Sequence, residues 1–138
     1  MITDIKQAVT KLCSILHELP TKIEDLNEGR YKLIVFKNET CLLKYTRQHF
    51  LTFKDNAHGE SLNVDDLNIA IEKGIKRVFI VYTDGKIYTI SPKTILTQAE
   101  VRKTEAEGKD TYSFNMNLLI NMKTNKQEET KWIKNKKN

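Results

Sequence analysis

Apolar residues near the start of the chain recur every three or four positions, a spacing that gathers them on one side of a helix. They are Ile5, Ala8, Val9, Leu12, Ile15, Leu16 and Leu19. The pattern predicts an amphipathic helix with Thr3 as its N-cap and Pro20 as its stop. A second helix is predicted from Val64 to Lys73, with Asn63 as its N-cap and Gly74 at its C-terminal exit.

Four runs rich in β-branched and aromatic residues predict two hairpins. Residues 31–37 and 41–46 flank a turn at 37–40. Residues 76–83, the most β-prone run of the chain, join residues 86–90 through Asp84-Gly85, a strong hairpin signal.

Shorter segments complete the expected order. Residues 50–54 predict a further short strand, and Ser91-Pro92 begins a short helical turn. Residues 111–114 are expected to be extended, and residues 116–122 to form a last short helix capped by Asn115. The order helix, hairpin, helix, hairpin, helix predicts an α/β fold, an α+β sandwich in which helices flank a mixed central β-sheet.

The length and composition fit one domain with one core. The chain has 138 residues, 39% hydrophobic and 30% charged, with 5 Gly and 2 Pro, which excludes collagen-like and low-complexity chains. We expect a single domain over residues 1–122 and a basic, mobile tail over residues 123–138. The tail holds six lysines and two acids, so it supplies most of the net charge of +5.

Several classes of protein and site find no support in the sequence. No apolar run is long enough to span a membrane and no targeting segment precedes the first helix, so we expect a cytoplasmic protein without a membrane partner. Cys13 and Cys41 stand apart and are expected to be small buried hydrophobes. His17, His49 and His58 are expected to lie on the surface, and no common nucleotide-binding, metalloprotease or hydrolase motif occurs.

The first hairpin carries the strongest chemical signal. Residues 30–54 hold six cations and one acid. If the turn centres on Asn38-Glu39, Lys32 faces Tyr45 and Arg30 faces Arg47, so three cations and a phenol share one face. Such a face would bind phosphate through its cations, with Tyr45 stacking on a base or donating its hydroxyl. The alternative is a solvated strand end whose cations pair with the acidic residues of segment 55–72.

The run from Lys32 to Arg47 is preceded by a helix and followed by a helix, the strand 76–83 and the segment 86–95. This arrangement resembles the PD-(D/E)xK nuclease superfamily, and most closely the archaeal Holliday-junction resolvases. The resemblance covers about residues 3–120 and implies a restriction-endonuclease-like fold and a homodimer. In that family an Asp opens the first strand of the hairpin and a Glu-x-Lys ends the second. The two carboxylates hold Mg²⁺, and the Lys positions the water for phosphodiester hydrolysis.

The resemblance places the family's three catalytic positions on Lys32, Tyr45 and Arg47. Magnesium prefers hard oxygen ligands, and an ammonium and a phenol in place of two carboxylates remove the charge that would hold it. The sequence therefore predicts a degenerate nuclease site that binds phosphate without cutting it, with no catalytic residue and no metal.

We expect a DNA- or RNA-binding protein that binds the phosphate backbone and does not recognise a base sequence. The expected binding residues are Arg30, Lys32, Lys44, Tyr45, Arg47, Lys54, Lys76 and Arg77. No cofactor is expected. Two alternatives stay open: an active endonuclease or junction resolvase that uses Mg²⁺ and displaced carboxylates, and a subunit that only binds another protein.

Overall fold

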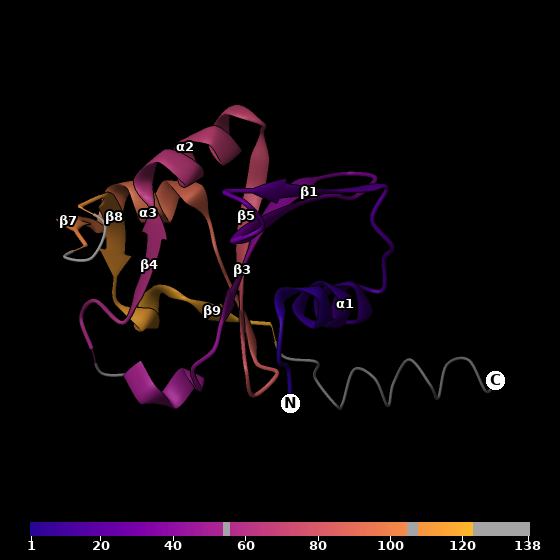
Figure 1. Cartoon of the computed structure of the whole chain (residues 1–138), viewed down its shortest axis with the longest axis horizontal. Coiled ribbons are helices and arrows are strands. Elements are labelled where there is room, and N and C mark those ends of the chain that lie inside the picture. Colours follow the sequence, from indigo (N-terminus) through magenta and orange to yellow (C-terminus); the bar gives the residue numbers. More distant parts are fainter. Residues whose placement is uncertain (54–55, 105–107, 123–138) are drawn as a thin grey trace.

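The computed structural model describes residues 1–53, 56–104 and 108–122 of the chain (Figure 1). The expected mobile tail, residues 123–138, and one expected binding residue, Lys54, lie outside the described residues.

The described residues form two β-sheets. The larger sheet contains, in spatial order, β1 (Lys22–Leu26), β2 (Tyr31–Val35), β3 (Thr40–Thr46), β5 (Ile75–Tyr82), β6 (Ile87–Ile90) and β9 (Ile120–Asn121). The smaller sheet contains β4 (Glu60–Asn63), β8 (Asp110–Phe114) and β7 (Glu100–Lys103). Two 3₁₀ turns, η1 (Phe50–Phe53) and η2 (Met116–Leu118), lie in the connections.

The larger sheet is mixed because β3 and β5 run parallel, whereas the other neighbouring strands are antiparallel. Parallel neighbours need a crossover. Here the chain passes from β3 through η1, β4 and the helix α2 (Val64–Glu72) before it returns as β5. This excursion builds the first strand of the smaller sheet beside the larger one (Figure 1).

One face of the larger sheet is covered by α1 (Ile5–Leu16), which buries Ala8, Val9 and Leu12 against the sheet. The N-cap is Asp4, whose carboxylate accepts the Gln7 N–H at 2.8 Å. The predicted cap, Thr3, is therefore wrong by one residue: its own N–H donates to the Gln7 side chain at 2.9 Å. The helix ends before Pro20, at His17, whose positive φ of 54° turns the chain away.

The opposite face of the larger sheet carries the second half of the core. Here α2, α3 (Pro92–Gln98) and the smaller sheet pack on the other side of the strands from α1 (Figure 1). Buried side chains from all of these elements meet in one cluster, which includes Leu33, Leu42, Ile80, Leu67, Ile95 and Phe114. The predicted α/β class, an α+β sandwich with a mixed sheet, is confirmed.

Some short elements differ from the prediction. Residues 50–53 form η1 and no strand, because Phe50 turns inward and stacks on Tyr88 at 4.0 Å between ring centroids. Residues 116–122 form η2 and the short strand β9 and no helix. Strands β1, β4 and β7 were not predicted.

The first hairpin forms as predicted but in a different register. Val35 pairs with Thr40 and Tyr31 with Lys44, so the turn centres on Lys37-Asn38. The expected pairing of Lys32 with Tyr45 is wrong by two residues: Lys32 faces Leu43. A shift of two keeps each side chain on its predicted face but separates those that were expected to meet.

Candidate functional site

The expected binding residues do not gather on one face. Because side chains alternate along a strand, Lys32, Tyr45 and Arg77 share the α1 face with the buried residues Ile34 and Phe79, while Lys44 lies on the opposite face. Lys76 and Arg47 are exposed but lie at opposite ends of the parallel β3–β5 pair. The structure therefore divides the expected residues into separate environments.

On the α1 face, the side chains expected to bind phosphate make structural contacts. The Lys32 ammonium forms an ion pair with Asp25 of the unpredicted neighbouring strand β1. The Tyr45 hydroxyl donates to the Ile2 carbonyl at 2.7 Å. The same carbonyl accepts the Thr83 hydroxyl at 2.7 Å, and the Ile2 N–H donates to the Thr83 carbonyl at 3.0 Å. Tyr45 thus fastens the start of the chain to the sheet.

The same contacts test whether Lys32, Tyr45 and Arg47, the positions implied by the nuclease resemblance, could bind Mg²⁺. At the two carboxylate positions stand a lysine held by Asp25 and a tyrosine whose hydroxyl donates to a backbone carbonyl. Neither group is a hard anionic oxygen ligand, so Lys32, Tyr45 and Arg47 do not fit the metal. In the described ranges, no group of three or more His, Cys, Asp or Glu side chains stands close enough to hold a metal ion.

The Arg77 side chain of β5 contacts Glu39 and Phe79. Its Nε donates to one oxygen of Glu39 at 3.2 Å and its Nη2 binds the other, while the guanidinium lies 4.7 Å from the centre of the Phe79 ring. A two-pronged carboxylate contact with ring stacking fixes the side chain. Arg77 therefore ties the turn of the first hairpin to β5.

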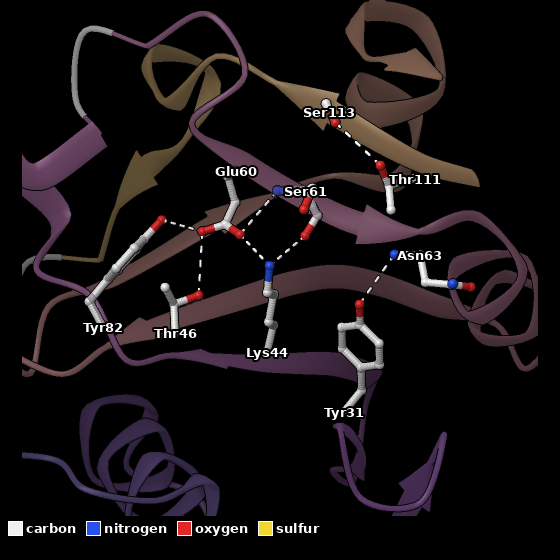
Figure 2. A network of polar contacts seen from close by, with 9 residues as sticks. All are labelled: Tyr31, Lys44, Thr46, Glu60, Ser61, Asn63, Tyr82, Thr111 and Ser113. Carbon is white, nitrogen blue, oxygen red and sulfur yellow. Dashed lines mark hydrogen bonds and ion pairs between the residues drawn. The ribbon is translucent and has the colours of Figure 1, made fainter. Parts of the chain in front are cut away.

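The other face of the sheet holds a polar network centred on Glu60 of β4 (Figure 2). The Glu60 side chain is 3% exposed. One of its oxygens binds the Lys44 ammonium and accepts the Ser61 N–H at 3.1 Å. The other accepts the Tyr82 hydroxyl at 2.7 Å and the Thr46 hydroxyl at 3.5 Å. A buried carboxylate is tolerated when its oxygens are paired in this way.

The network joins the two sheets. Lys44, Thr46 and Tyr82 belong to the larger sheet, and Glu60 belongs to the smaller one. Burial and the nearby Glu60 charge raise the pKa of Tyr82 above its usual value, so its hydroxyl keeps the proton that it donates. A second link runs from the Asn63 N–H to the Tyr31 hydroxyl at 3.2 Å (Figure 2).

Beside this network lies a small, mostly enclosed pocket with a volume of about 60 Å³. Both sheets and the β1–β2 and β7–β8 connections contribute to its walls. It is lined by Arg30, Tyr31, Lys44, Ser61, Asn63, Thr104, Lys109 and Thr111. Three of these residues are cations, none is an acid, and the others carry hydroxyl or amide groups. We call it the cationic pocket.

Several residues that line the pocket carry hydrogen-bond donors. The Lys44 ammonium has three N–H donors, of which the Glu60 carboxylate and the Ser61 carbonyl, at 2.6 Å, take two. Tyr31 accepts a hydrogen bond through its hydroxyl oxygen, which leaves the hydroxyl proton to be donated. Neither the Ser61 hydroxyl nor the Asn63 side-chain NH₂ has a hydrogen-bond partner within the part of the chain that the structure describes.

Local backbone structure sets the position of Arg30 at the rim. Asn27, Glu28 and Gly29 all have positive φ, between 53° and 87°, and the Arg30 N–H closes the turn on the Asn27 carbonyl at 3.1 Å. The Asn27 side chain donates to Asp66 in the first turn of α2 at 2.8 Å. The turn is therefore held against the helix that follows β4.

Sequence reasoning found two members of this pocket, Arg30 and Lys44, and missed the others. Lys109, Thr104 and Thr111 come from a distant segment with no local signal for binding. Glu60 was visible only as one acid in an acidic segment. The β-alternation of residues 41–46 was the available clue, since it places Lys44 on the face away from Tyr45.

Comparisons with known proteins add no further assignment. No family model matches the chain, and neither a curated protein nor a solved structure matches it. No helix among the described residues has the length and apolar character needed to cross a lipid bilayer.

Proposed function

We propose that this protein binds nucleic acid, DNA or RNA, through its phosphates, and that the cationic pocket is the centre of the binding surface. The observation that carries the proposal is the convergence of Arg30, Lys44 and Lys109 on one pocket whose described lining residues include no acid. Cations and hydrogen-bond donors arranged in this way are what phosphate oxygens require.

The proposal keeps two of the residues expected from sequence, Arg30 and Lys44, and adds Lys109. Lys32, Tyr45 and Arg77 lie on the α1 face of the larger sheet, away from the cationic pocket. There they bind Asp25, a backbone carbonyl and Glu39, respectively, so these three side chains are assigned to the scaffold. Arg47 and Lys76 are exposed and provide outer contacts for a long strand.

The proposal also keeps the nuclease-like scaffold that the resemblance implies. It is supported by the order α1, the β2–β3 hairpin, α2 and the β5–β6 hairpin, which is the order on which the resemblance rests. Binding without cleavage is supported by the residues at the three catalytic positions, which do not fit Mg²⁺. The free thiols of Cys13 and Cys41 are in keeping with a cytoplasmic protein.

A binding assay with charge-neutralising variants tests the proposal. Labelled single-stranded, duplex and junction DNA, and single-stranded RNA, are titrated at about 50 and about 200 mM salt. We expect binding that weakens with salt. Lys109→Gln and Arg30→Gln should each weaken it several-fold and lower the dependence on salt by about one counterion.

Lys11→Gln is the matched control. Lys11 is an exposed lysine on α1, on the opposite side of the larger sheet from the pocket, and its loss should leave the affinity unchanged. Equal losses of affinity in all three variants would mean that the net charge of the protein attracts nucleic acid, and that the pocket is not the centre of binding. Cut product after addition of Mg²⁺ or Mn²⁺ would favour the nuclease alternative. Absence of binding to every probe would leave the protein-binding alternative.

A further inference from the structure

We propose that the cationic pocket binds the terminal phosphate of a nucleic-acid strand, in preference to a phosphate within the strand. The inference rests on the proposed function and names the chemical group that the pocket receives. Three properties of the pocket support it: its size, its charge and the buried donors on its floor.

The size fits a single phosphate group. A water molecule needs about 10–15 Å³, so a pocket of about 60 Å³ has room for about four to six water-sized groups, close to the number of heavy atoms in one phosphate. The pocket is walled by two sheets and two connections. An internal phosphodiester carries two ester-linked sugars, both of which would need room beside the bound phosphate. A terminal phosphate needs room for one.

The charge favours a phosphomonoester. An internal phosphodiester carries one negative charge. A terminal phosphate has a second ionisation with a pKa of about 6 and therefore carries between about −1.5 and −2 at neutral pH. The lining residues Arg30, Lys44 and Lys109 bring three positive charges. Glu60 is the acid in contact with Lys44, and its oxygens are bound within the network behind the pocket.

The floor supplies donors suited to a group with several free oxygens. Tyr31 is 2% exposed and Asn63 is 7% exposed, yet both line the pocket. Together with Ser61 they bring two hydroxyls and an amide to the residues that line it. Asn63 is held in place because its side-chain oxygen accepts the Asp66 N–H at 3.0 Å, which directs the NH₂ group away from α2. The Asn63 amide and the Lys44 ammonium are both donors that suit the oxygens of an anion.

The test compares strand ends. Strands of identical sequence, labelled at an internal base, carry a 5′-phosphate, a 3′-phosphate or hydroxyls at both ends, and their affinities are measured by fluorescence anisotropy. We expect one phosphorylated end to bind about tenfold or more tightly than the hydroxyl-ended strand, as charge-assisted hydrogen bonds allow. A hydroxyl-ended strand one nucleotide longer controls for added charge, and it should gain much less.

Two variants assign the effect to the pocket. Ser61→Ala removes a floor donor and Lys109→Gln removes a rim charge. Each should reduce the preference for the phosphorylated end several-fold, with native far-UV circular dichroism as the check on folding. Because Lys109 is exposed, the second variant carries the test if the first does not fold.

The outcomes separate this inference from the proposed function. Salt-sensitive binding that is equal for phosphorylated and hydroxyl ends would overturn the terminal-phosphate inference and leave nucleic-acid binding intact. A preference that persists unchanged in Lys109→Gln would place the end elsewhere and also overturn it. No binding of any strand would remove the proposed function itself.

Discussion

The ion pair between Lys44 and Glu60 makes a quantitative prediction about stability. The Glu60 side chain is 3% exposed and that of Lys44 is 21% exposed, so both charges have lost most of their contact with water. Removing one partner of a buried pair leaves the other charge uncompensated and costs about 3–5 kcal/mol. Removing both leaves no buried charge, so the double variant should cost much less than the sum of the two single ones.

The environment of each partner predicts which single variant is the more harmful. Lys44→Met leaves the deeper charge, Glu60, with the Tyr82 and Thr46 hydroxyls and one N–H as its donors, and should lie near the upper end of that range. Glu60→Gln preserves an acceptor for Tyr82 and leaves Lys44 bonded to the Ser61 carbonyl, so it should cost about 3 kcal/mol or less.

The assay is urea unfolding at neutral pH, followed by far-UV circular dichroism, for the wild type, both single variants and the double variant. We expect a coupling free energy of about 2 kcal/mol or more. The exposed Lys22–Glu24 pair serves as the control and should show a much smaller coupling. Additive losses at Lys44 and Glu60 would refute the reasoning, because they would mean that the two charges do not stabilise each other.

Four further predictions follow from the same structure. Burial, with a smaller contribution from the Glu39 charge, raises the pKa of Cys41 from 9.0 to about 12. The unfolded chain therefore loses this proton first, and stability falls as pH rises from about 9 towards 12. The urea midpoint of Cys41→Ala should fall less over this range, and parallel pH curves would contradict the assignment. Asn63→Ala removes the N-cap of α2 and should cost about 1 kcal/mol in urea unfolding, whereas Asn63→Asp keeps the cap and should cost less. The hydrogen bond and the charge of Lys22, with a smaller effect of Lys73, lower the pKa of Glu24 below 4.5. The Glu24 carboxylate therefore stabilises the fold at pH values above its pKa in the unfolded chain, and this stabilisation is lost as pH falls through its pKa in the folded protein. The difference in melting temperature between wild type and Glu24→Gln should therefore shrink in acid, and a constant difference would exclude this effect. The homodimer implied by the nuclease resemblance predicts twice the chain mass in light scattering at micromolar concentration, and a monomer mass would remove it.

The elements that the sequence predicts well are those whose own pattern is sufficient. The helix α1 has a continuous apolar stripe, and the β5–β6 hairpin joins two apolar runs through Asp84-Gly85. Strand β7, by contrast, has the sequence Glu-Val-Arg-Lys and is exposed at all four positions. Its pairing with β8 is the reason that it is extended, and nothing within the four residues signals it.

The register of the first hairpin shows a second limit of local reasoning. Turns centred on Asn38-Glu39 and on Lys37-Asn38 both contain a turn-prone asparagine, so the local sequence leaves them nearly equivalent. In the folded protein the Phe36 N–H bonds to the Glu39 carbonyl at 2.8 Å, and the Glu39 side chain binds Arg77 of β5. A partner 38 positions away therefore favours the observed turn. The same shift of two residues separates Lys32 from Tyr45, although both stay on the face that was predicted for them.

The hydrogen bonds between Ile2 and Thr83 have a consequence for how the chain folds during its synthesis. Ile2 bonds to a residue that is made 81 positions later, and the apolar side of α1 packs on Phe79 and Val81 of β5. A twelve-residue helix is marginal by itself in water. At about 5–20 residues per second, α1 waits on the order of several seconds for β5. During that interval its apolar stripe is exposed, so the newly made α1 is a segment to which a chaperone can bind.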